Sequence, residues 1–211
     1  MNRHAYKSTG ISLLTGAFLI IVTMVLHPSG GSLERIVAIS KTIMIAHALA
    51  ILSLPFLLFG CYGLTKVLMD RWKLSILALI TTSFALIAAL FAALFNGLVL
   101  PYFLNQYADQ LEAKADILRP ISNFSFAINV PLDYVFIVGI CLAILLYSVL
   151  ILIERKFPAW IGYLGVVLIL LAIAGGVTGF VFTSLLGFRI FVFGIATWIL
   201  GSGVYLFRHR E

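Results

Sequence analysis

Four polar side chains lie inside long apolar segments and are the first candidates for chemistry: His47, Asn96, Asn129 and Asp133. Asp133 is the only acid, and His47 the only histidine, well inside such a segment. Ionisable groups within a bilayer cost about 2.5–3.5 kcal/mol even on insertion scales, so they tend to mark functional positions. An aspartate beside a histidine can take up and release a proton as a substrate moves.

The spacing of these residues predicts which of them share a helix face. Ser125, Asn129 and Asp133 follow one another at four-residue steps, which places them on one side of a helix. In the preceding segment a stripe of small residues at helical spacing ends at Asn96, which turns this amide toward the interior of a bundle. Prolines inside three of the segments remove backbone hydrogen bonds and free carbonyl groups: Pro55, Pro101 and Pro131.

We therefore predict a polar, partly hydrated pocket that opens to the outer side of the membrane and is lined by these four side chains. Tyr102 and Tyr134 are expected near its mouth or floor. Such a pocket would bind or carry a small or lipid-like molecule. The alternative is a purely structural polar network, since interhelical hydrogen bonds contribute only about 0.6 kcal/mol on average.

Metal chemistry is a second use of the same residues. Catalytic zinc takes three protein ligands and a water, and His47 with Asp133 supplies only two. His27 ends the first apolar segment, whereas His47 lies about 20 Å below Ser32 if the second helix begins there. The same difference in depth disfavours a haem held by two histidines, so we assign no metal and no cofactor. A membrane-embedded enzyme for a lipid-soluble substrate and an accessory subunit remain alternatives to a binding protein.

The first loop, HPSGGSLER at positions 27–35, is the most distinctive peptide of the chain. Its proline and glycines stop a helix, and its second serine can cap the next one. The glycine amides could cradle an anion, and a lipid phosphate is the candidate at that depth. The residues of this candidate site are His27, Gly30, Gly31, Arg35 and Lys41. The simpler interpretation is a helix-ending turn with an interfacial histidine.

The composition explains why these positions must be considered in a membrane. Apolar residues make up 63% of the 211 residues and charged residues 10%, against about 45–50% and 25% in soluble domains. So little charge cannot cover the outside of a soluble protein. The net charge of +6 is spread over loops and termini rather than gathered into a basic face, which argues against nucleic acid as a partner. Membrane lipids and a small-molecule ligand are the expected partners.

Six segments are long and apolar enough to span a bilayer, which needs about 20 residues. They cover residues 10–26, 42–64, 74–100, 121–153, 160–184 and 189–207. The predicted fold is a single all-α domain over residues 1–211. The first span has a positive beginning like that of a signal peptide, but its apolar run is longer and no A-x-A site follows. Between the third and fourth spans we expect a short amphipathic helix at the outer surface, with an apolar side formed by Tyr107, Leu111, Ala115 and Leu118.

The lysines and arginines predict the orientation. With the N-terminus inside, nine of the 14 basic residues fall on the inner side. These nine are Arg3, Lys7, Lys66, Arg71, Lys73, Arg155, Lys156, Arg208 and Arg210. We therefore expect both termini inside. The expected location is a bacterial cytoplasmic membrane. Cys61 and Cys141 fall inside spans and are interpreted as small buried apolar residues.

Overall fold

Six helical segments are long and apolar enough to cross a membrane in the computed structural model, which describes residues 3–208. Those residues form helices, turns and loops and contain no strand. The all-α prediction with six spans is thus confirmed. The spans are α1 (Arg3–Leu26), α3 (Ser40–Val67), the continuous segment Trp72–Asn105, α6 (Ala115–Glu154), α7 (Ala159–Val177) and α8 (Leu185–Arg208).

Most spans extend a few residues beyond the predicted bounds, the first beginning at Arg3 and the fourth at Ala115, and two spans differ in kind. The third span is built from α4 (Trp72–Ala92), the π-helix η1 (Ala93–Val99) and α5 (Leu100–Asn105). The fifth span ends at Val177 rather than at 184. Gly179, just beyond, has a φ of +83°, a left-handed conformation that glycine adopts without the steric penalty of a Cβ. The apolar composition continues through this turn, which is why composition alone extended the helix.

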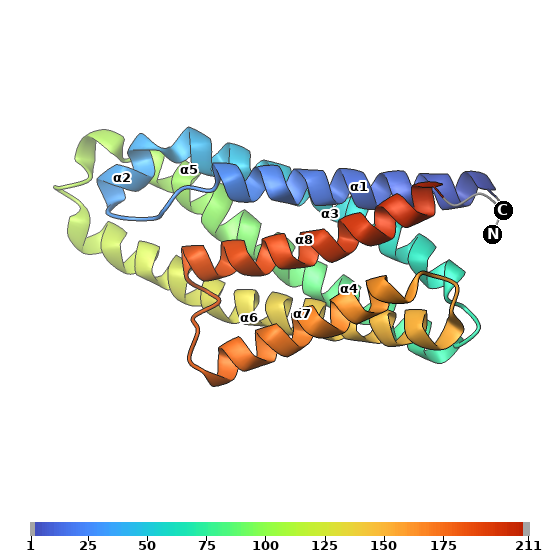
Figure 1. Ribbon diagram of the computed structural model, residues 1–211. Helices are drawn as coiled ribbons and strands as arrows, with labels where there is room; N and C mark the ends of the chain where they lie inside the picture. The colour runs from blue at the N-terminus through green and yellow to red at the C-terminus, as the bar shows by residue number, and fades with distance from the viewer. Residues whose placement is uncertain (1–2, 209–211) are drawn as a thin grey trace.

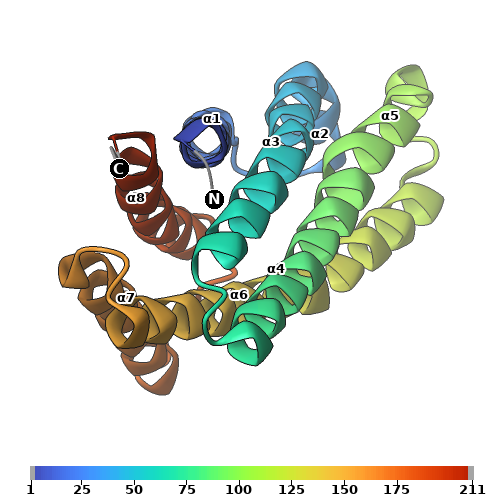
Figure 2. The same cartoon turned by 90° about the vertical axis from the view of Figure 1, so that its right-hand side faces the viewer.

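The six spans form a closed ring, each packing against its neighbours in chain order (Figure 2). α1 packs against both α3 and α8, so the first and last spans close the ring. A side chain at Gly10 would collide with the backbone of Phe207, which shows how closely these two helices approach. The start of α1 and the end of α8 therefore lie at the same end of the molecule (Figure 1).

The interior of the ring is filled at this end. Tyr147 and Trp198 are almost fully buried and lie ring to ring, with centroids 6.2 Å apart. The Tyr147 hydroxyl lies 2.8 Å from the Thr65 hydroxyl, and the Trp198 indole donates to the Ile161 carbonyl at 3.1 Å. These large side chains are thus hydrogen-bonded within a packed core.

Charged side chains join the loops outside this packed end. Lys156 lies 2.7 Å from Asp70 and 3.2 Å from Glu154, and it also donates to the Val67 carbonyl at 3.0 Å. Burial alone lowers the pKa of Lys156, but its bonds to the two carboxylates raise that pKa overall. The loops α3–α4 and α6–α7 are therefore tied together.

The opposite end is partly covered by short elements with a small core of their own. α2 (Leu33–Ala38) packs near α5 and the start of α6, and Ser32 accepts a hydrogen bond from the Arg35 amide as its predicted cap. The predicted amphipathic helix is wrong: this segment holds only a 3₁₀ turn, η2 (Ala108–Gln110), and α6 already begins at Ala115. The small core consists of Leu33, Ile36, Ile43, Leu100, Leu104, Leu111 and Leu118. This core buries Leu111 and Leu118, two of the residues expected on the apolar side of that helix.

Candidate functional site

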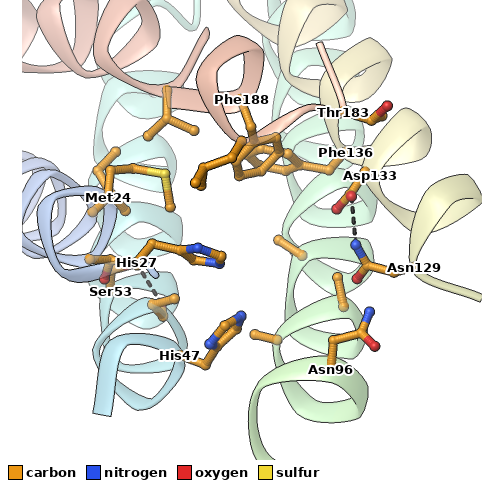
Figure 3. Close-up of a pocket in the computed structure, with 18 of the residues that line it drawn as sticks. Met24, His27, His47, Ser53, Asn96, Asn129, Asp133, Phe136, Thr183 and Phe188 are labelled. Carbon is orange, nitrogen blue, oxygen red and sulfur yellow. Dashed lines mark hydrogen bonds between the residues drawn. The ribbon is translucent and has the colours of Figure 1, made fainter. Parts of the chain in front are cut away.

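A cavity of about 320 Å³ lies within the ring at the end that carries α2 and α5 (Figure 3). This volume is at the lower end of the range of small-molecule pockets. Most of the lining is apolar and comes from α1, α3, α4, α6 and α8. Gly30 and Phe126 belong to the lining and are also exposed, so the cavity reaches the surface at this end. The polar side chains in its wall are Thr23, His27, His47, Ser53, Asn96, Asn129, Asp133 and Thr183.

His27 and His47 face each other within this cavity. Their ring centroids are 4.8 Å apart, and the rings are tilted by 55°. His47 bonds through Nδ1 to the Ile43 carbonyl at 2.8 Å, and His27 through Nδ1 to the Pro28 carbonyl at 3.0 Å. Because a carbonyl only accepts, each Nδ1 carries the hydrogen. In the neutral rings both Nε2 atoms therefore keep a free lone pair.

The expected difference in depth between these two histidines is wrong, because α2 and α3 are not one helix. The chain breaks at Ile39, whose φ of −107° and ψ of 15° separate the two helices. α3 begins at Ser40, so His47 lies only about 10 Å along it. α1 ends well short of the end that carries α2 and α5, so His27 is deep enough to meet His47 (Figure 1).

Arg189, at the start of α8, holds His27 in place. Its guanidinium donates to the carbonyl of Met24 at 3.2 Å and to that of His27 at 2.6 Å. These carbonyls belong to the end of α1, where backbone acceptors have no partner within the helix and the helix dipole is negative. Burial lowers the pKa of His27, and the charge of Arg189 lowers it further against the raising effect of the bond to Pro28. The neutral imidazole is therefore favoured.

The wall opposite the histidines carries Asn96, Asn129 and Asp133 (Figure 3). The amide of Asn129 donates to Asp133 at 2.6 Å, one helical turn along α6. The hydroxyl of Ser125 donates to Asn96 Oδ1 at 2.7 Å and so joins α6 to η1. Asn96 Nδ2, in contrast, is buried without a hydrogen-bond partner. A buried donor left unpaired costs about 1–3 kcal/mol, so this atom is a natural contact for a ligand acceptor.

The π-helix η1 positions this part of the wall. Its seven residues, Ala93–Val99, carry Asn96 and Gly97. A Cβ at Gly97 would overlap the ring of His47, so glycine is what allows α3 and η1 to approach here. Single-turn π-helices inside α-helices frequently occur at functional sites. The sequence did not lead us to predict this π-helix.

The four predicted wall residues do line one cavity, but they do not all touch one another. His47 and Asp133 lie on opposing walls, and no hydrogen bond or ion pair within residues 3–208 joins either histidine to Asp133 (Figure 3). Tyr102 and Tyr134 are exposed and do not line the cavity, so the structure does not place them at its mouth or floor.

Only two of the five residues of the candidate anion site line the cavity. His27 and Gly30 line the cavity, whereas Gly31, Arg35 and Lys41 do not. Arg35 turns back to the loop and donates to the hydroxyl of Ser29 at 2.9 Å. The structure thus shows a loop that is braced by its own arginine.

Several lining residues were not recognised from the sequence. Ser53, Phe136, Thr183 and Phe188 come from three separate parts of the chain and meet only in the folded ring. Met24 carried a usable signal, because it precedes His27 by three residues and therefore lies on the same side of α1. Among the described residues, no three His, Cys, Asp or Glu side chains are grouped so that they could hold a metal ion.

Comparisons of the chain with protein-family models, with curated proteins and with solved structures give no match. The functional argument therefore rests on the cavity and the side chains that line it.

Proposed function

We propose that this multi-pass membrane protein binds a small, largely apolar molecule that carries hydrogen-bond donors, such as hydroxyl groups. The observation that carries this proposal is the distribution of polarity in the cavity. Polar side chains occupy two facing walls, and apolar side chains form the rest of the lining. This is the usual composition of a ligand pocket, in which apolar area provides affinity and a few polar groups fix orientation.

The apolar part of the lining supports a lipid-soluble ligand. Ile20, Leu54, Phe136, Phe188 and Val192 all face the cavity. Burial of apolar ligand area against such side chains gains about 25 cal/mol per Å². The surface of the ring also exposes many large apolar side chains, as expected for a protein in contact with lipid.

The polar part of the lining supports a ligand with donor groups. Nε2 of His27 and Nε2 of His47 are acceptors without a partner in the protein. On the facing wall, Asp133 accepts one bond from Asn129 through Oδ2 and keeps Oδ1 available. Acceptors therefore outnumber donors around the cavity. A molecule with two hydroxyl groups separated by an apolar body would satisfy both walls.

Carriage across the membrane is a further step that this conformation supports only at one end. The core around Tyr147 and Trp198 fills the other half of the ring. A carrier would have to open that core, whereas a binding protein would not. We therefore propose binding as the function and treat carriage as a motion to be tested separately.

Native mass spectrometry of the gently purified full-length protein tests this proposal. We expect an organic adduct on the wild type that is lost in Asp133→Asn and in His47→Ala. Asn123→Ala is the matched control, because Asn123 lies on the same helix but is exposed and outside the cavity. An adduct of equal abundance on all four proteins, or a bare wild-type protein after extraction with lipid-like detergent, would contradict the proposal.

A further inference from the structure

The histidine pair has a feature that ligand binding through hydrogen bonds does not require. Both rings are fixed in the same tautomer by backbone carbonyls, through Nδ1 in each case. Histidines that bind metals commonly donate their second ring nitrogen to a carbonyl in this way, which fixes the ring and directs the other nitrogen to the ion. Two imidazoles prepared alike within one cavity are suited to bind one ion.

The distance between the rings indicates how such an ion would be held. A metal–nitrogen distance of about 2.0–2.1 Å places an imidazole centroid about 3.2 Å from the ion. Two rings at a tetrahedral angle then have centroids about 5 Å apart, and two rings on opposite sides of the ion about 6.4 Å apart. The observed 4.8 Å fits the first arrangement. It does not fit two axial ligands of a haem.

Met24 provides a sulfur donor in the lining of the same cavity. It precedes His27 by one helical turn and is 95% buried (Figure 3). A thioether is a soft ligand that favours Cu(I), whereas zinc sites are completed by thiolate, imidazole or carboxylate. No third side chain of those three types is grouped with the pair in residues 3–208. We propose that Met24, His27 and His47 bind one Cu(I) ion, a site that goes beyond the proposed ligand-binding function.

The charges around the pair favour a monovalent ion. Arg189 is a cation close to His27, but its guanidinium is bonded to the carbonyls of Met24 and His27 at the negative end of α1. These carbonyls therefore offset part of the positive potential that Arg189 produces in the cavity. The carboxyl group of Asp133 faces the same space from the opposite wall. A single positive charge meets less repulsion from Arg189 than a divalent ion would.

Competition with a coloured Cu(I) chelator tests the site. The full-length protein in detergent, under anaerobic conditions, is titrated against the Cu(I)–bicinchoninate complex. We expect the wild type to withdraw one Cu(I) per chain, and Met24→Leu and His27→Ala each to weaken binding by about tenfold or more. Met24→Leu nearly conserves volume, so this variant should remain folded even if His27→Ala does not.

Two control variants remove the same side-chain types elsewhere. Met44→Leu and His4→Ala lie outside the cavity and should bind Cu(I) like the wild type. X-ray absorption of the loaded protein should show nitrogen scatterers and one sulfur, with the sulfur lost in Met24→Leu. No withdrawal by the folded wild type would overturn the proposal. So would equal binding by Met24→Leu, or equal loss in Met44→Leu.

Asp133→Asn separates this site from the organic ligand. We expect that variant to lose the organic adduct and to keep Cu(I) binding, because its three copper ligands are unchanged. A wild type that carries the adduct but takes up no Cu(I) overturns the copper site alone. A wild type that takes up Cu(I) but never carries an adduct overturns the ligand-binding function alone.

Discussion

Single residues far apart in the chain fix the geometry of the cavity, and Arg189 is the clearest case. It bridges α8 and the end of α1, 162 residues apart at its contact with His27. Its planar guanidinium offers several donors in a fixed geometry, which suits two neighbouring carbonyls. The position of the His27 ring therefore depends on a residue that does not itself line the cavity.

Replacing Arg189 should loosen the end of α1. Arg189→Met leaves the carbonyls of Met24 and His27 without this donor, and we expect it to lower the free energy of unfolding by about 1–3 kcal/mol. Arg189→Lys should fall in between, because an ammonium group cannot reproduce the fork. Thermal unfolding in detergent measures the effect, with the exposed Arg119→Met as control. An Arg189→Met protein as stable as the Arg119→Met control would show that the bridge contributes nothing.

The burial of His27 predicts a pH dependence of stability. Its folded-state pKa lies below the ordinary value of 6.5, first because of burial and then because of the charge of Arg189. As the pH falls through 6.5, the unfolded chain binds a proton at His27 before the folded protein does. Above pH 6.5 the ring is neutral in both states and does not lower the free energy of unfolding. This free energy then falls as the pH falls from 6.5 toward the folded-state pKa of His27.

Unfolding temperatures between pH 7.5 and 5.5 measure this loss. His27→Gln should remove part of the dependence, because glutamine does not titrate. His4→Gln changes an exposed histidine and should leave the dependence as it is in the wild type. The same dependence in the wild type and in His27→Gln would rule out His27 as its source.

At the scale of elements, two irregularities bring the side chains together. The break at Ile39 separates α2 from α3, and the π-helix η1 interrupts the third span beside His47. A continuous helix from Ser32 would have placed His47 far below His27, and an uninterrupted α-helix would have turned Asn96 to a different angle. The site therefore depends on departures from regular helix.

Gly97→Ala tests how tightly η1 fits against α3. The new Cβ would overlap the His47 ring, so we expect the ring to be displaced and the protein to be less stable by about 1–3 kcal/mol. Cu(I) binding should weaken in the same variant. Gly194→Ala is the matched control, because the nearest atom to its Cβ would be a leucine methyl at 3.4 Å. Equal unfolding temperatures and Cu(I) affinities in the two variants would argue against the close approach.

The sequence predicted the helices better than it predicted their irregularities. Long apolar runs in a chain with 10% charged residues leave few alternatives to six spans, and four-residue steps correctly placed Asn129 beside Asp133. The break at Ile39 was missed because neither proline nor glycine occurs there. Contacts across the ring, such as His27 with His47, were missed because periodicity says nothing about the neighbouring helix.

At the scale of the whole molecule, the ring has a packed half and a hollow half. The packed half holds Tyr147 and Trp198 and lies toward the start of α1 and the end of α8. The hollow half lies under the loop at 27–32, α2 and α5. If the distribution of basic residues sets the orientation, the cavity faces the outer side of the membrane. A ligand or a Cu(I) ion, which would compete for the same Nε2 lone pairs of His27 and His47, would then enter from outside.

Cysteine labelling in intact cells tests this orientation. In a background of Cys61→Ala and Cys141→Ala, we expect a membrane-impermeant maleimide to label Gly30→Cys directly. Asp70→Cys should be labelled only after the membrane is permeabilised. Both positions are exposed, and neither change alters the number of lysines and arginines that predicts the topology. The reverse pattern would place the cavity mouth on the cytoplasmic side, and its ligand and metal would then have to come from the cytoplasm.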